Sequence, residues 1–149
     1  MQGESFRLRQ GFGETAVALA KAVRTRQRRI VGNPVMQWQI VAKDPETLTR
    51  FYGSLFGWKI RTNNALGYRE VDTQNPRGIN GGVWPSPPEG HNLVQLFVEV
   101  DDVDAYIAKA TALGASVIVP KSELPDGDAL AIVLDPAGLS FGLYRPRTS

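Results

Sequence analysis

The sequence contains no cysteine and only one histidine, His91, among its 149 residues. The lack of cysteine excludes a disulfide framework, a thiolate nucleophile and a cysteine metal site. Catalytic zinc and non-haem iron sites take two or three histidines, so one histidine argues against both. Magnesium or calcium sites built from oxygen ligands alone stay open. A chain without cysteine is typical of a reducing compartment, and we expect a cytoplasmic protein.

Long apolar runs and a strong overall charge are also missing. No run of about 18 apolar residues occurs, so we expect no membrane span. The formal net charge is +2, but residues 1–32 carry seven Lys/Arg and two Glu, whereas residues 33–149 carry a net charge of −3. We therefore predict a basic N-terminal arm over residues 1–33, ahead of a mildly acidic domain.

The arm has several interpretations. Its composition favours a helix over residues 14–29, and a solvated tail is the alternative. Glu14 and Lys21 interrupt its apolar stretch, which argues against a secretory signal. No aromatic residue lies within the basic run 24–29, which argues against nucleic-acid binding. An arm that binds an acidic partner or drives dimerisation stays open.

Two similar halves follow the arm. In the first half, Asp44 and Pro45 supply an N-cap and a first-turn proline, and Gly57 supplies a helix end. Between them, apolar residues recur with helical spacing at Leu48, Phe51, Tyr52, Leu55 and Phe56. The strands predicted around this helix are Val35–Ala42, Trp58–Thr62, Leu66–Asp72 and Gly78–Trp84.

The second half repeats this order after a proline-rich linker. Asp102 caps its predicted helix and Gly114 ends it, so the two caps are 58 residues apart. The predicted strands are Leu93–Val100, Ser116–Val119, Ala129–Leu134 and Ser140–Tyr144. The pattern predicts one α+β domain over residues 34–146, made of two tandem βαβββ modules (34–84 and 93–146) joined by linker 85–92. Each module should form a curved sheet with an outer helix, and the two sheets should enclose a cleft.

Strand alternation predicts which side chains face the cleft. Met36, Trp38 and Ile40 should pack under the first helix, and alternate residues from Val94 to Val100 should form the apolar face of the fifth strand. Gln37 and Gln95, 58 residues apart, should face each other across the cavity. The predicted cleft residues are Gln37, Gln39, Tyr68, Trp84, Gln95, Phe97 and Glu99. The alternatives are a solvated sheet face for the polar residues and core positions for Tyr68 and Trp84.

Three stretches of the chain resemble a known family. Asp44-Pro45-Glu46 leads into Phe51-Tyr52-Gly53-Ser54-Leu55-Phe56-Gly57-Trp58, and the second half contains Val100–Asp104 and Leu134–Leu143. These stretches resemble the vicinal oxygen chelate superfamily, which includes glyoxalase I, bleomycin-resistance proteins and extradiol dioxygenases. The resemblance covers residues 34–146 and implies the paired-module fold. It also implies a homodimer.

The resemblance further indicates where a metal would bind. The family's first-strand ligand falls on Gln37 and its second-half partner on Gln95. The last-strand carboxylate falls on Gly142, and its first-half partner falls on Gly81 or Gly82. None of these positions carries His, Asp or Glu, so we predict no metal and no other cofactor. A divalent metal in a non-standard site is the alternative.

The predicted function is binding of a small organic molecule in a metal-free cleft. The alternative is a metal-dependent lyase or dioxygenase of the same superfamily, and enzymatic activity stays open. Glu99 is the one candidate for a catalytic base, with a structural role as its alternative. His91 lies in the linker, where we expect a surface residue.

Overall fold

A computed structural model describes residues 16–19 and 32–149 of the chain. Residues 16–19 are helical and belong to the predicted helix 14–29, while the basic run 24–29 lies outside the described residues. Residues 33–149 form one compact unit that contains every strand of the described chain.

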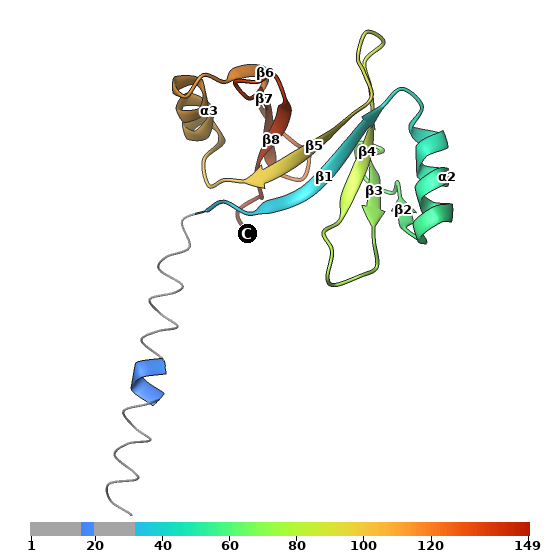
Figure 1. Cartoon of the computed structure of the whole chain (residues 1–149), viewed down its shortest axis with the longest axis horizontal. Coiled ribbons are helices and arrows are strands. Elements are labelled where there is room, and N and C mark those ends of the chain that lie inside the picture. Colours follow the sequence, from blue (N-terminus) through green and yellow to red (C-terminus); the bar gives the residue numbers. More distant parts are fainter. Residues whose placement is uncertain (1–15, 20–31) are drawn as a thin grey trace, which may run out of the picture. The chain divides into compact units, whose positions relative to one another are not determined.

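The elements of this unit follow the same order in its two halves (Figure 1). The first half consists of β1 Val35–Ala42, α2 Pro45–Phe56, β2 Lys59–Arg61, β3 Arg69–Asp72 and β4 Gly81–Pro85. The second half consists of β5 Leu93–Glu99, α3 Val103–Ala112, β6 Ser116–Glu123, β7 Ala129–Leu134 and β8 Ser140–Arg145. The fold class is α+β, as predicted.

Both predicted helix starts are confirmed. The Asp44 carboxylate accepts a hydrogen bond from the Thr47 backbone N–H at 3.1 Å, and the Asp102 carboxylate accepts one from Ala105 N–H at 3.0 Å. Each bond satisfies an N–H group that has no partner within its own helix. Gly57 ends α2 with a left-handed φ of 70°, a conformation that glycine adopts without steric cost.

Two strands begin later than predicted because asparagine side chains hold the chain in loops. The Asn64 side chain accepts hydrogen bonds from Leu66 N–H and Tyr68 N–H, so β3 starts only at Arg69. The Asn80 side chain accepts from the backbone and hydroxyl of Thr73. β4 accordingly starts at Gly81 rather than at Gly78. Backbone N–H groups that are bound to an asparagine side chain are not available for the hydrogen bonds of a β-sheet.

The two separate sheets predicted from the sequence are in fact one. The strand order is β2-β3-β4-β1-β5-β8-β7-β6, in a single mixed eight-stranded sheet. The halves join where β1 pairs antiparallel with β5, with Gln39 opposite Gln95 and Trp38 opposite Leu96. In two separate sheets, β1 and β5 would each have one edge with unpaired backbone N–H and C=O groups, and their pairing satisfies these groups. The halves therefore pair within one chain, through backbone hydrogen bonds.

The helices pack on one face of this sheet, toward its two ends. α2 contacts β1, β2 and β4, and α3 contacts β6, β7 and β8 (Figure 1). Between α3 and the sheet lies a core of small and branched residues, which includes Val103 of α3 and Ala131 and Val133 of β7. The other face of the sheet is left to line a cavity.

Several predicted core positions lie elsewhere. Met36 is 42% exposed and lines the cavity, because the β1 register shifts between Val35 and Gln37. Val94 and Leu96 on the helix face of β5 remain 66% and 50% exposed. Phe51, Leu55 and Phe56 of α2 are also exposed, so that helix buries less of its apolar stripe than its spacing predicted.

Within the described residues, neither the length nor the hydropathy of any helix is sufficient for a membrane crossing.

Candidate functional site

A cavity of about 1070 Å³ lies against the face of the sheet that carries no helix. Its size is at the upper end of the range typical of small-molecule sites. β1 and β5 supply the middle of the lining through four side chains, which we call the floor. The floor residues are Gln37, Gln39, Gln95 and Phe97. Because the floor comes from both halves, the cavity exists only when β1 and β5 pair.

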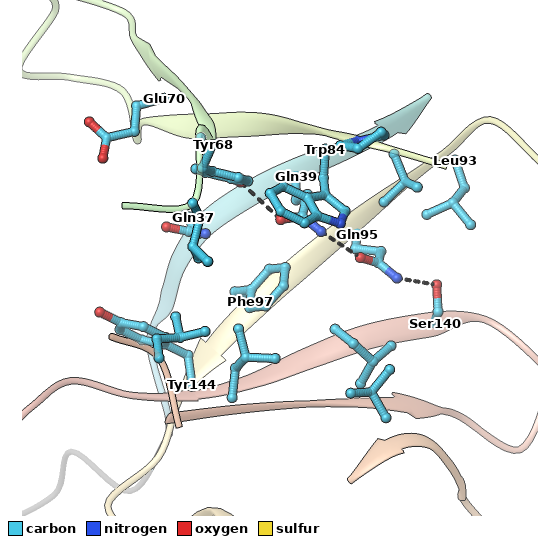
Figure 2. Close-up of a pocket in the computed structure, with 18 of the residues that line it drawn as sticks. Gln37, Gln39, Tyr68, Glu70, Trp84, Leu93, Gln95, Phe97, Ser140 and Tyr144 are labelled. Atoms are coloured by element: carbon cyan, nitrogen blue, oxygen red, sulfur yellow. Dashed lines mark hydrogen bonds between the residues drawn. The ribbon is translucent and has the colours of Figure 1, made fainter. Parts of the chain in front are cut away.

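A chain of hydrogen bonds crosses the floor (Figure 2). The Tyr68 hydroxyl donates to Gln39 Oε1 at 2.9 Å, and Gln39 Nε2 donates to Gln95 Oε1 at 3.1 Å. Gln95 Nε2 then donates to the Ser140 hydroxyl at 3.0 Å. Gln95 is only 6% exposed, so these bonds meet the requirement that a buried amide be hydrogen-bonded. Every member of the chain is uncharged at neutral pH.

Gln37 differs from the other two floor glutamines. It faces the cavity opposite Phe97 and is half-buried. Its amide makes no hydrogen bond with any other side chain in the part of the chain that the structure describes. Its donor and acceptor are therefore available to a molecule in the cavity.

Aromatic rings form one wall of the cavity. The Tyr68 and Trp84 rings lie side by side (Figure 2). Their centroids are 5.8 Å apart, and Trp84 is 36% exposed. Phe97 lies on the floor and is 2% exposed. A partly exposed indole beside a phenol offers a flat apolar surface with polar edges, which suits a planar ligand.

The opposite wall is aliphatic and comes from the second half of the chain. The side chains of Leu130, Ile132 and Leu134 on β7 line it, together with Val119 on β6. These four residues are called the aliphatic wall below. The β7 residues are half-buried and Val119 is 36% exposed, so each leaves some apolar surface uncovered.

Carboxylates gather around the cavity. The lining includes Glu70, Asp72, Asp126 and Asp128, against one arginine, Arg61, which forms a 3.0 Å ion pair with Asp72. Burial opposes ionisation of Asp128, but hydrogen bonds from the Tyr144 hydroxyl and the Arg147 N–H outweigh it and lower the pKa. Asp128 therefore carries its charge at neutral pH, and the surroundings of the cavity are net negative.

The same surroundings hold two tyrosines in the neutral form. Burial raises the pKa of Tyr68, and the charge of Glu70 raises it further. Burial also raises the pKa of Tyr144, as do its hydrogen bond to Asp128 and the nearby carboxylate charges. Neither phenol can act as a base near neutral pH, so both serve as hydrogen-bond donors.

The structure brings six of the seven predicted cleft residues to the cavity lining and separates the seventh. Glu99 lies in a shallow second pocket with Asn33, Asp101 and Arg145, because it ends β5 beyond the last floor residue. Gln37 and Gln95 both line the cavity, but the prediction that they face each other is wrong. Antiparallel register places Gln39 opposite Gln95 and Phe97 opposite Gln37, since residues related by the repeat are displaced from each other along paired strands.

Sequence reasoning missed several lining residues. His91 lines the cavity, although it is exposed as expected for a linker residue. Ser140 and Tyr144 line it from β8, and the aliphatic wall lines it from β6 and β7. Alternation along the predicted strands could have placed the β7 and β8 residues on one face, but only the strand order puts that face beside the floor.

The residues present do not fit the divalent metal that the resemblance implies. A Cβ atom at Gly142 would lie 2.3 Å from the Phe97 ring, and one at Gly82 would lie 2.1 Å from the Tyr68 hydroxyl. Aromatic rings thus occupy the space that ligating carboxylates at these positions would need. Gln37 and Gln95 are neutral amides, whereas hard cations favour charged oxygens. Across residues 16–19 and 32–149, no three His, Cys, Asp or Glu side chains are grouped to hold a metal.

The contact of Gly142 with Phe97 predicts the effect of one added methyl group. Gly142→Ala should lower the free energy of unfolding by about 1–3 kcal/mol, because the new Cβ overpacks against the ring. Urea denaturation measures this change. Gly78→Ala is the control, since its nearest neighbour would lie at 3.6 Å. In a double-mutant cycle, Phe97→Ala should remove most of the cost of Gly142→Ala, and strict additivity would contradict the packing argument.

The raised pKa of Tyr68 predicts an alkaline loss of stability. The folded state holds the phenol proton more tightly than the unfolded state, whose tyrosines ionise near 10.0. The stabilising effect is complete below that pH and falls as the pH rises above it. Urea unfolding at pH 8 to 11 should show a steeper loss for the wild type than for Tyr68→Phe. Equal slopes for the two proteins would show that Tyr68 is not the responsible group.

Comparison with known proteins agrees with this architecture. A family model described as a glyoxalase-like domain matches residues 37–144. Proteins of Mycobacterium bovis and Mycobacterium tuberculosis, both named "Putative glyoxylase CFP32", are 30% identical over a 109-residue alignment that covers 68% of this chain and 41% of theirs. The chain thus spans about two-fifths of the length of these relatives.

Solved structures show the same fold at low sequence identity. A hypothetical protein from Bacillus halodurans superposes with a TM-score of 0.59 at 10% identity, over 79% of this chain and 97% of that one. The methylmalonyl-CoA epimerase of M. tuberculosis gives 0.54 at 15% identity, over 76% and 88% of the two chains. The chain therefore belongs to the glyoxalase-like domain family of the vicinal oxygen chelate superfamily.

Proposed function

We propose that the protein binds a small organic molecule in a metal-free cavity between its two halves. The observation that carries this proposal is the chain of neutral hydrogen bonds from Tyr68 through Gln39 and Gln95 to Ser140. One member, Gln95, occupies a position where the resemblance places a metal ligand, and the chain leaves the Gln37 amide and the Trp84 ring available to a ligand.

The metal-dependent lyase or dioxygenase is the weaker alternative. Family membership and the name glyoxylase carried by two relatives support it. The donor set opposes it, because Gly82 and Gly142 have no ligating side chain and the Tyr68 and Phe97 rings fill the adjacent space. Glu99 is also a poor candidate for a base at this site, because it lines a different pocket. Binding without turnover fits the cavity better.

The domain organisation and cellular location belong to the same proposal. We propose that residues 34–84 and 93–146 are repeats of one module joined by linker 85–92, and that residues 1–33 are a separate arm. The equal order of elements and the parallel pairs β1–β4 and β5–β8 support the repeat. The absence of cysteine supports a cytoplasmic location.

A tryptophan assay tests the binding proposal. A panel of planar aromatic compounds should include one that saturably quenches the intrinsic fluorescence and raises the melting temperature of chelator-treated protein. Trp84→Phe should lose most of the quenching, because Trp84 lines the cavity. Trp58→Phe is the matched control, since Trp58 packs on Trp38 at the helix face and not in the cavity.

The same assay separates the two functions. Nickel, zinc, manganese and ferrous ions should leave the melting temperature unchanged relative to the chelator control. A saturable rise with one of these metals, reversed by chelation, would favour the metal enzyme. If no compound of the panel binds, the binding proposal is contradicted.

We further propose that the protein is a homodimer, in which a second copy covers the outer face of the central strands. On this face Ile40 lies opposite Val94, and Trp38 lies opposite Leu96. Val94 and Leu96 are 66% and 50% exposed although neither is polar. Contiguous exposed apolar residues mark interaction surfaces, and a twofold dimer requires such a patch to match itself. These residues lie on paired antiparallel strands near the middle of the sheet, an arrangement that supports self-association.

Light scattering coupled to gel filtration tests the dimer. The full chain should elute with twice its mass of 16.3 kDa. Leu96→Glu should shift it to the monomer, because the new carboxylate would have to be buried unpaired in the interface. Leu113→Glu is the control, since Leu113 is 72% exposed at the C-cap of α3, which contacts β6, β7 and β8, and its change should leave the dimer intact. A monomeric wild type would contradict the proposal.

A further inference from the structure

The two halves of the sheet carry opposite chemistry at equivalent positions. Equivalence follows from strand register. Gln39 pairs with Gly82, and Phe97, 58 residues after Gln39, pairs with Gly142. Gly82 and Gly142 are therefore equivalent, and both lie beneath an aromatic ring. From these two glycines the register can be followed outward on each side.

One strand further out, Glu70 pairs with Gly82, and Ile132 pairs with Gly142. Alternation then makes Asp72 equivalent to Leu134 and Tyr68 equivalent to Leu130, since each lies two residues from the first pair. All of these side chains line the cavity. The first half thus places polar or charged groups where the second half places leucine or isoleucine.

The same contrast extends to the next strands. Arg61 on β2 pairs with Glu70, and Val119 on β6 pairs with Ile132. A charged residue in the first half again corresponds to an aliphatic residue in the second. The divergence is therefore systematic across two pairs of equivalent strands, and it divides the cavity into a polar side and the aliphatic wall.

The charge of the polar side has one sign. Arg61 is already paired with Asp72, and Glu70 adds a further carboxylate. Asp126 and Asp128, in the loop between β6 and β7 of the second half, add negative charge to the rest of the lining. Glu70 is exposed and forms no ion pair within the described residues. An anionic group here would meet uncompensated negative charge, whereas a neutral or cationic group would not.

We infer that the cavity takes an amphipathic molecule with an uncharged or cationic polar end and a hydrocarbon chain. The polar end lies between Gln37, Tyr68 and Trp84, and the chain lies along the aliphatic wall. Molecules that end in a carboxylate are disfavoured. This inference rests on the proposed function, because it specifies the class of ligand for the same cavity.

A homologous series tests the position of the chain. 4-Alkylphenols from ethyl to hexyl should bind with an affinity that rises about fourfold for each added methylene, the value expected for burial of a CH₂ group. The matching 4-alkylbenzoates should bind at least tenfold more weakly than the phenols. Titration calorimetry on the full chain measures both series.

Variants of the aliphatic wall test whether its side chains cause the dependence of affinity on chain length. Ile132→Thr should flatten the dependence on chain length while leaving the affinity for 4-ethylphenol within about threefold. Val119→Thr, a change of similar volume at a more exposed position, provides a second variant if the first does not fold. Leu139→Thr is the control, because Leu139 is exposed outside the cavity lining and should keep the wild-type slope. Glu70→Gln should reduce the discrimination against benzoates.

The outcomes separate this inference from the proposed function. Phenols that bind with no dependence on chain length, or with a slope unchanged by both aliphatic-wall variants, would overturn the inference and leave metal-free binding intact. Benzoates that bind as tightly as phenols would overturn the charge assignment. Failure of every organic compound in both series and in the aromatic panel would overturn the proposed function itself.

Discussion

The antiparallel pairing of β1 with β5 is the interaction on which the rest of the structure depends. It joins the halves into one sheet and places Gln39 beside Gln95, so that the floor of the cavity spans both halves. The helices cover the ends of the opposite face, which leaves the central strands exposed there. A single backbone pairing thus creates both the cavity on one face and the apolar patch on the other.

The floor carries neutral amides, Gln37 and Gln95, at two positions where the resemblance implies metal ligands. Glycine at positions 82 and 142 removes the side chains that would carry ligating carboxylates, and the Tyr68 and Phe97 rings fill the space. The buried polar groups that remain are amides and hydroxyls, which satisfy one another in sequence. Such a network avoids the large cost of burying a charge without a partner.

The halves have the same order of elements but present different side chains to the cavity. Register relates Tyr68, Glu70 and Asp72 to Leu130, Ile132 and Leu134, so identical positions in the sheet carry different chemistry. In a symmetric cavity, a ligand would have two equivalent orientations. For the proposed amphipathic ligand, the difference between the halves would remove that degeneracy, because the polar end and the apolar end would have different partners. The geometry of the fold is conserved within the chain while the specificity lies in the side chains.

The sequence by itself determined the α+β class, the order of the elements and the helix ends at Asp44, Gly57 and Asp102, because caps and hydrophobic periodicity are local. It also determined which alternate residues of β1 and β5 share a face, except at Met36, where the register of β1 shifts. Only the tertiary structure decided that the two halves form one sheet, that Gln39 rather than Gln37 lies opposite Gln95, and that Glu99 lies outside the cavity. The exposure of Val94 and Leu96 was likewise decided only by where the helices pack. The reason is that register and packing join residues about 40 to 60 positions apart, and their relation depends on the whole strand order rather than on any local pattern.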